Sequence, residues 1–158
     1  MNLKHVTSED RTYLFNVLQK YLYELSAYYQ DEPDKEGNIA YDWFDSYFED
    51  DPEREAFLLV EGAKTVGFLL INTFSDLDED IDHAVAELTI YPPFRSRGLA
   101  TKAVRELFSS RPGRWELTYQ NSNDAAATFW GHMTRPYAPE LTQINPGETI
   151  LSFEVRGL

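Results

Sequence analysis

The chain has 158 residues, no cysteine and a hydrophobic fraction of 42%, which fit one globular domain and exclude disulfide and thiolate chemistry. Its formal net charge of −13 argues against a nucleic-acid partner, because phosphate backbones are bound by cationic surfaces. No segment approaches the roughly 18 apolar residues of a membrane helix, and the opening residues lack a secretory signal, so we expect no membrane partner and a cytoplasmic location.

The first part of the chain predicts one short strand and two helices. The strand covers residues 3–6, and Thr7 or Ser8 can cap the helix that follows. Apolar side chains then recur at helical spacing, which predicts a long amphipathic helix that ends at about Tyr29. These side chains are Leu14, Leu18, Tyr21, Leu25 and Tyr28. After a polar loop, the aromatic segment 41–50 predicts a second, short helix that stops before the next proline.

The middle of the chain changes from helical spacing to apolar runs that favour β-strands. Residues 56–62 and 65–74 are such runs, and Gly62 lies in the turn between them, which predicts a hairpin. An acidic connection leads to a further strand at residues 83–91. This strand ends at two prolines, because proline cannot donate a hydrogen bond to a neighbouring strand.

The last part of the chain alternates helices with strands. Helices are predicted at residues 98–110 and 121–133, and strands at residues 114–119, 140–144 and 148–155. The order of elements predicts a mixed α/β or α+β fold around one sheet. No linker or change of composition divides the chain, so we expect a single domain over its whole length.

Positive charge is concentrated at the start of the helix that begins at Gly98. Residues 1–90 hold 6 Lys and Arg against 21 Asp and Glu, whereas residues 91–158 hold 8 against 6. A helix start carries partial positive charge and unsatisfied N–H groups, so cations there are repelled unless an anion binds. Small residues at 98 and 100 let phosphate oxygens approach the backbone. The pattern predicts an anion site, although surface arginines on an acidic interaction domain are the alternative.

The segment 87–104 resembles the acetyl-coenzyme A signature of the GNAT superfamily of N-acetyltransferases, Arg/Gln-x-x-Gly-x-Gly/Ala. The matching residues are Arg95, Ser96, Arg97, Gly98, Leu99 and Ala100. The following helix is similar to the second motif of the superfamily, Asn-x-x-Ala-x-x-aromatic, with Asn123, Ala126 and Phe129 in register. The resemblance implies a GNAT-like fold, with a mostly antiparallel central sheet flanked by helices, and acetyl-coenzyme A as the acetyl donor.

The resemblance also implies where the donor binds. Backbone amides at the helix start would hold its pyrophosphate, the preceding strand would pair with its pantetheine arm, and an asparagine would bind the arm from the other side. The implied cofactor-binding residues are Leu88, Thr89, Ile90, Arg95, Ser96, Arg97, Gly98, Leu99, Ala100, Thr101, Asn123 and Phe129. The sequence does not choose among four cations for the remaining phosphate, which are Lys102, Arg105, Arg111 and Arg114.

Glu87 is the candidate general base. An alkyl amine with a pKa near about 10.4 is protonated at neutral pH, yet it must be neutral to attack a thioester. A carboxylate within an otherwise apolar strand has a raised pKa, which suits this role. On a period of two we expect Glu87 to face with Val85 and Thr89, opposite Leu88 and Ile90. The alternative is a glutamate at the sheet surface with a structural role.

The group that protonates the leaving thiolate is a second question. In the superfamily a tyrosine often follows the aromatic residue of the second motif, but this chain has Trp130 there. An indole is no useful proton donor, so Tyr137 or water takes the role in our hypothesis. The departure keeps open a noncatalytic module that binds or senses coenzyme A.

The acidic first half predicts a cationic acceptor, because its negative potential attracts amines. We expect the primary amine of a small basic molecule, such as a polyamine, or of a Lys-bearing peptide. The resemblance places the N-terminal aromatic segments around the acceptor, which makes Tyr28, Asp42 and Trp43 candidate contacts. No metal is expected, because His83 and Glu87 lack a third ligand. The sequence leaves a homodimer open.

Overall fold

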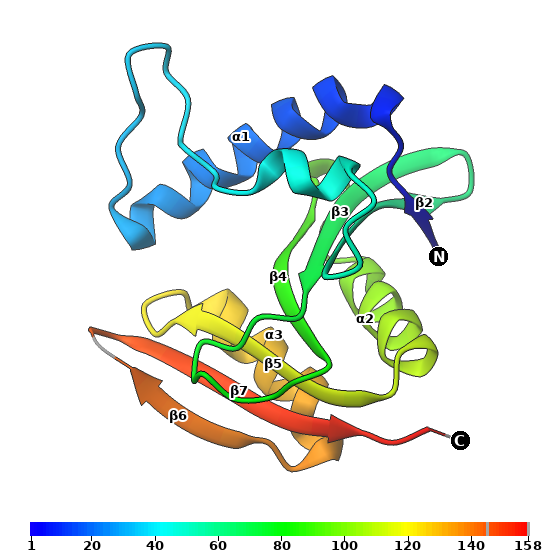
Figure 1. Cartoon of the computed structure of the whole chain (residues 1–158), viewed down its shortest axis with the longest axis vertical. Helices are drawn as coiled ribbons and strands as arrows, with labels where there is room; N and C mark the ends of the chain where they lie inside the picture. Colours follow the sequence, from blue (N-terminus) through cyan, green and yellow to red (C-terminus); the bar gives the residue numbers. More distant parts are fainter. Residues whose placement is uncertain (145, 158) are drawn as a thin grey trace.

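The computed structural model describes residues 1–144 and 146–157, which form a seven-stranded sheet with the order β1-β2-β3-β4-β5-β7-β6 (Figure 1). The strands are β1 Asn2–His5, β2 Arg54–Glu61, β3 Lys64–Asn72, β4 His83–Ile90, β5 Gly113–Gln120, β6 Glu140–Ile144 and β7 Glu148–Val155. Only β4 and β5 are parallel, and the other neighbouring strands in the described part are antiparallel. The predicted mixed, mostly antiparallel sheet is therefore confirmed.

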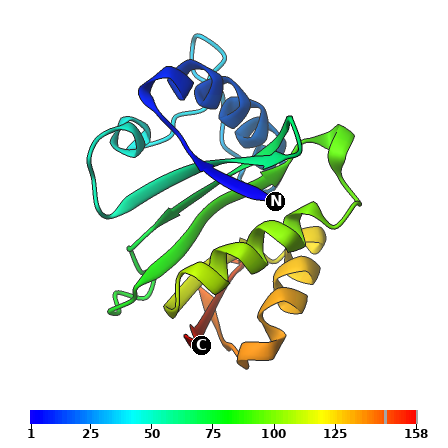
Figure 2. The same cartoon turned by 90° about the vertical axis from the view of Figure 1, so that its right-hand side faces the viewer.

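Three α-helices pack on this sheet, α1 Arg11–Tyr29 on one face and α2 Leu99–Ser110 with α3 Asp124–Thr134 on the other (Figure 2). In the described part of the chain, four 3₁₀ turns lie between the larger elements, at Ser8–Asp10, Phe44–Phe48, Pro92–Phe94 and Arg135–Tyr137. None of the helices described is both long and apolar enough to cross a membrane.

The start and the buried face of α1 follow the sequence pattern. The backbone N–H of Thr7 donates to Oδ2 of Asp10 at 2.8 Å, which closes a capping turn before the helix. The buried side chains of α1 recur every four residues and are Leu14, Leu18 and Leu22. They pack with the buried aromatic and aliphatic side chains of one core, so the predicted amphipathic helix is confirmed.

The predicted second helix over residues 41–50 is wrong, because only the 3₁₀ turn Phe44–Phe48 forms there. Trp43 has a φ of 68° in the left-handed region, which a right-handed helix cannot include. The turn still buries Phe44 and Tyr47 against β2 and β3, so the aromatic pattern reports the core correctly and the helix length incorrectly.

β4 and β5 separate after a short parallel pairing. Residues 83–85 pair with residues 115–117, and β4 then diverges from β5 and runs on beside β3, as Figure 1 shows. The main chain of residues 86–90 therefore has no partner strand on that side within the described part of the chain, whereas its other side stays paired with β3. This separation opens the sheet at its centre.

A β-bulge at Ala86 changes which way the next side chain points. Leu70 of β3 pairs with Glu87, whereas Ile71 pairs with Val85, so Ala86 is the extra residue. Val85 and Leu88 pack in the core under α2 and α3, and Glu87 points towards α1. The expectation that Glu87 faces with Val85 is wrong, because the bulge interrupts the period of two, but Glu87 does lie opposite Leu88.

We expect Leu18→Ala to lower the free energy of unfolding by about 2–5 kcal/mol, because the removed side chain is fully buried and leaves a cavity under α1. Asn16→Ala, at an exposed position of the same helix, is the matched control and changes the free energy by at most about 0.5 kcal/mol. Urea unfolding followed by circular dichroism measures both values. Equal effects of the two substitutions would contradict the buried face assigned to α1.

Candidate active site

Two cavities meet where β4 and β5 separate. The larger one, the splay cleft, has a volume of about 650 Å³ and lies between β4, the turn before α2 and the start of α3. The smaller one, the acidic cavity, has a volume of about 390 Å³ and lies between the end of α1, β4, β5 and the loop after β3. Glu87 lines both cavities, and so do Tyr29 and Thr118.

Two tyrosines from separate elements hold the carboxylate of Glu87. The hydroxyl of Tyr21 on α1 donates to Oε1 at 3.1 Å, and the hydroxyl of Tyr41 donates to Oε2 at 2.8 Å. Burial raises the pKa of Glu87 from 4.5 to about 7, against the opposing effect of the two hydrogen bonds. At neutral pH the carboxyl group is therefore poised to accept a proton.

The turn from Arg95 to Gly98 forms a cradle of backbone donors. Ser96 and Gly98 have φ values of 64° and 74°, in the left-handed region. Within the described residues, the N–H groups of residues 96–101 have no hydrogen-bond acceptor. Such a series of N–H groups at a helix start suits an anion, and the binding of a phosphate there stays a prediction. Gly98 is required for its backbone angle, since an added Cβ would meet no atom within 4 Å.

Arg95 ties this turn to α1. Its two terminal nitrogens donate to the two carboxylate oxygens of Glu24 at 3.0 Å each, and its Nε donates to the carbonyl of Ile90 at 2.7 Å. This pairing lowers the pKa of Glu24. Arg95 therefore positions the cradle through the fold, and its contact with a phosphate stays a prediction.

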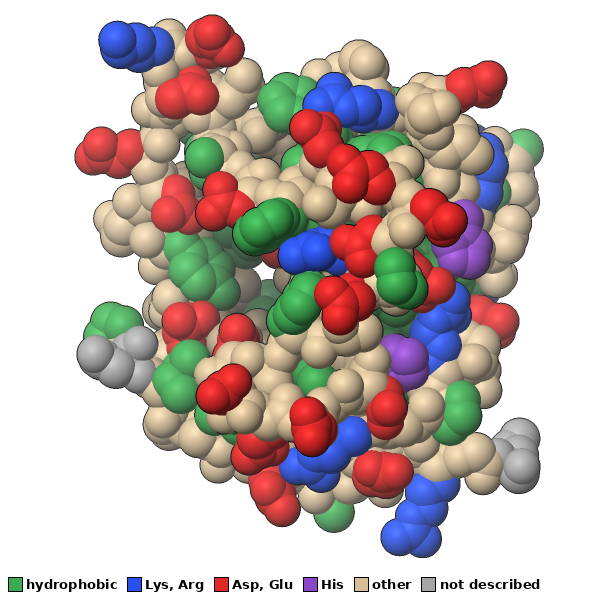
Figure 3. All heavy atoms as spheres, viewed as in Figure 1, with side chains coloured by type: hydrophobic (Ala, Val, Ile, Leu, Met, Phe, Trp, Pro, Cys, Tyr) green, Lys and Arg blue, Asp and Glu red, His purple; other side chains and the backbone are tan. Residues whose placement is uncertain are grey.

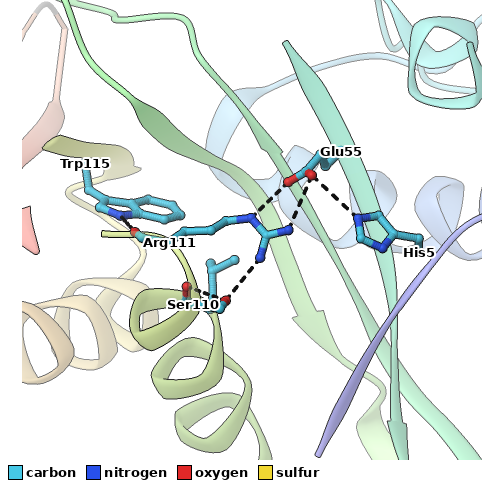
Figure 4. Close-up of polar contacts among 6 residues, drawn as sticks. His5, Glu55, Ser110, Arg111 and Trp115 are labelled. Carbon is cyan, nitrogen blue, oxygen red and sulfur yellow. Dashed lines mark hydrogen bonds and ion pairs between the residues drawn. The ribbon is translucent and has the colours of Figure 1, made fainter. Parts of the chain in front are cut away.

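Two of the four cations considered for the remaining phosphate lie far from the cradle. Arg111 follows the C-terminal end of α2, roughly 18 Å of helix away, and donates to Glu55 at 3.0 and 3.3 Å (Figure 4). His5 lies 3.5 Å from the same carboxylate. Arg114 lies at the start of β5, where its guanidinium is 3.9 Å from the carboxylates of Glu79 and Glu140. The first two turns of α2 hold the other candidates, Lys102 and Arg105.

The second predicted motif lies on the opposite wall of the splay cleft. Oδ1 of Asn123 accepts the N–H of Ala126 at 3.2 Å and caps α3. The rings of Phe129 and Trp130 pack edge to face with their centroids 4.9 Å apart, and the Trp130 side chain is only 8% exposed. The twelve predicted cofactor-binding residues all line the splay cleft except Arg97, whose guanidinium stacks over an aromatic ring.

Three predicted residues are not brought to either cavity. Tyr137 packs between Phe108 and Phe153 in the core and lines neither the splay cleft nor the acidic cavity. Asp42 is exposed outside them, and Trp43 is 68% exposed. The fourth weak candidate, Tyr28, lines the splay cleft and not the acidic cavity.

The residues that sequence reasoning missed come from segments distant in the chain. Tyr21 belongs to the apolar stripe of α1, and Tyr41 immediately precedes Asp42, so both were visible only as aromatic core. Tyr29 lines both cavities, and its pKa is raised to about 12 by burial and by nearby carboxylates, of which Glu148 contributes most. Within residues 1–144 and 146–157, no group of three or more His, Asp or Glu side chains could hold a metal ion.

Comparison with known protein families identifies the family of this chain. Residues 14–133 match the Acetyltransferase (GNAT) family. The chain therefore belongs to the GNAT acetyltransferase family. The comparison with curated proteins gives no match.

Solved structures of similar fold include acetyltransferases. An acetyltransferase from Thermus thermophilus is 21% identical, with a TM-score of 0.70 over 97% of this chain and 96% of that chain. The GNAT domain of S. lividans PAT is 10% identical, with a TM-score of 0.65 over 96% and 89%. The ribosomal-protein-S18-alanine N-acetyltransferase from Escherichia coli is 12% identical, with a TM-score of 0.61 over 99% and 95%. These likenesses establish the GNAT-like fold.

We expect Tyr41→Phe to raise the pKa of Glu87 above its value of about 7, because the substitution removes a hydrogen bond that stabilises the carboxylate. Carbon-13 NMR titration of the Glu87 carboxyl group measures the shift. Tyr13→Phe, which removes an exposed hydroxyl pair with Tyr91, is the control and leaves this pKa unchanged. A lowered pKa in the Tyr41 variant would refute the assigned hydrogen bond.

Proposed function

We propose that the chain is an N-acetyltransferase that moves the acetyl group of acetyl-coenzyme A to a primary amine by direct attack in a ternary complex. The observation that carries the proposal is the position of Glu87, a carboxyl group with a raised pKa at the junction of the splay cleft and the acidic cavity. A donor in one cavity and an amine in the other would meet beside this base.

The splay cleft fits the donor in three respects. Its cradle of free N–H groups at residues 96–101 suits a pyrophosphate. Its wall of β4, residues 88–90, offers main-chain groups on the side without a partner strand, which suits the amide groups of a pantetheine arm. Its volume of about 650 Å³ is in the range of cofactor sites. When bound, acetyl-coenzyme A would supply the activated acetyl thioester.

The residues around the junction account for the proton transfers. Glu87 takes one proton from the ammonium group, and the neutral amine then attacks the thioester carbonyl carbon to form the new N–C bond. As the C–S bond breaks, the nitrogen loses a second proton to water, which leaves a neutral amide. A backbone N–H of residues 88–90 that faces the cleft stabilises the negative charge on the carbonyl oxygen. The departing sulfur then needs one proton. The geometry favours Tyr29 as its source, since no other tyrosine among the described residues lines both cavities.

The charge of the second cavity favours a basic acceptor. The ionisable carboxyl side chains that line it are Asp31, Asp76, Glu87, Glu116 and Glu148. No Lys, Arg or His belongs to its lining in the described part of the chain. A positively charged amine is attracted to such a cavity, and an acidic acceptor is repelled.

We expect Glu87→Gln to lower kcat by about 10²-fold or more at neutral pH, because an amide cannot accept the proton. The rate of the unsubstituted protein should rise with pH through about 7, as Glu87 loses its proton, and this inflection should be absent in the variant. Thiol release from acetyl-coenzyme A with a panel of amines measures both.

The control for this variant is Glu106→Gln, at an exposed position of α2, which should leave the rate and its pH dependence unchanged. The KM for acetyl-coenzyme A should be similar in all three proteins. An unchanged rate in Glu87→Gln would remove Glu87 from the reaction. Binding of coenzyme A without thiol release for any amine would favour the noncatalytic alternative.

We expect Gly98→Val to abolish the thermal stabilisation by coenzyme A, because a β-branched residue does not adopt the left-handed φ that shapes the cradle. A ligand at 100 times its Kd stabilises the folded state by about 2.7 kcal/mol, which a thermal shift assay detects. Gly62→Val is the matched control, since Gly62 also has a left-handed φ and open space around it but lies in the β2–β3 turn. Equal loss in both variants would contradict the assigned cradle.

A further inference from the structure

The acidic cavity contains a buried carboxylate that the transfer does not use. Glu116 on β5 is 1% exposed and lines this cavity. Its Oε2 accepts the hydroxyl of Ser75 at 2.7 Å, and its Oε1 accepts the N–H of Asp76 at 2.6 Å. Both donors are neutral, and none of the ion pairs in the described structure includes Glu116. A buried carboxylate without a cation is costly, so a cationic ligand would be strongly favoured beside it.

The strand next to Glu116 supplies no cation either. Ser152 on β7 is the direct cross-strand partner of Glu116, so the two side chains lie on one face of the sheet. Ser152 is 3% exposed, and its Oγ has no hydrogen-bond partner within the described residues. Ser152 is not part of the cavity lining, so this neighbour supplies neither a cation nor a hydrogen bond to Glu116.

The surrounding charges have the same sign. The backbone N–H of Asp76 donates a hydrogen bond to Glu116, and Oδ2 of Asp76 accepts a hydrogen bond from the hydroxyl of Thr118 at 2.6 Å. Burial raises the pKa of Glu148, and the charge of Asp76 raises it further. Figure 3 shows acidic side chains gathered around a hollow on this face of the molecule. These carboxylates repel one another unless a cation lies among them.

The strand register sets the distance between this wall and the base. Glu116 pairs with Ala84, and Glu87 follows Ala84 by three residues on β4, with the bulge at Ala86 between them. At about 3.3 Å per residue, shortened by the bulge, the backbone positions of the two residues are offset by roughly 7–10 Å along the strand. An alkyl chain of about four to six carbons spans this distance.

We propose that the acceptor is a small aliphatic diamine, whose reacting amine lies at Glu87 and whose second ammonium group is held by Glu116 and Asp76. This inference rests on the proposed acetyl transfer and adds the substrate class and the residues that select it. The second amine stays protonated. The first loses one proton to Glu87 and a second to water as its nitrogen forms the N–C bond and the C–S bond of the donor breaks. The volume of about 390 Å³ accommodates a molecule of this size.

The test compares 1,5-diaminopentane with 5-aminopentan-1-ol, which has the same length but no second charge, in the thiol-release assay. We expect kcat/KM to be about 10- to 100-fold higher for the diamine. In Glu116→Gln the ratio of the two values should fall to about one. Glu154→Gln, at an exposed position of β7, is the matched control and keeps the ratio of the unsubstituted protein. Equal use of both amines, or an unchanged ratio in Glu116→Gln, would overturn the proposal.

A binding experiment separates this proposal from the transfer itself. Titration calorimetry of 1,5-diaminopentane into the protein saturated with coenzyme A should show a Kd that weakens at least tenfold in Glu116→Gln. Diamine binding of this kind without thiol release would refute the proposed transfer and keep the diamine site, whereas an absence of binding would refute the site. Asp76→Asn, which changes an exposed side chain, provides the same comparison if the buried Glu116→Gln variant does not fold.

Discussion

The early separation of β4 from β5 is the constraint on which the rest of the site depends. Three residue pairs hold the two strands together, and beyond them the sheet is open. The opening leaves main-chain groups of β4 without a partner strand within the described chain, which soluble proteins avoid unless another chain or ligand pairs with them. It also creates the splay cleft and the acidic cavity on either side of one point in β4.

The bulge at Ala86 makes this opening chemically useful. Without it, the period of two would place Glu87 in the core under α2 and α3, with Val85. The extra residue turns the carboxylate towards α1, where Tyr21 and Tyr41 can reach it. Burial disfavours the charge, and the two hydroxyls moderate this effect without removing it, so the pKa is raised to about 7 rather than further. The same local irregularity therefore sets both the direction and the proton affinity of the side chain.

The two ends of the opening have opposite electrostatic character. One end has a helix start with free N–H groups and arginines, which suits an anionic donor. The other end is lined by carboxylates, which suits a cationic acceptor. The pair between Arg95 and Glu24 lies at the donor end and joins the α1 side of the molecule to the cradle. The turn that forms one wall of the splay cleft is therefore tied to α1.

The sequence by itself predicted the strands, the helices α1, α2 and α3, and the Gly98 turn and Glu87 as candidate site residues, because each rests on a pattern within a short segment. The spacing of apolar residues predicts the buried face of a helix, and Gly98 next to Arg97 predicts a helix start that suits a phosphate group. Only the tertiary structure decided the rest. It brought Tyr21 and Tyr41 to Glu87, placed Glu116 in the same cavity as Glu87, and left Tyr137, Asp42 and Trp43 outside both cavities. The physical reason is that three features depend on contacts between distant segments: the left-handed backbone of Trp43, the bulge at Ala86 and the separation of β4 from β5. The spacing of residues within a short segment does not predict such contacts.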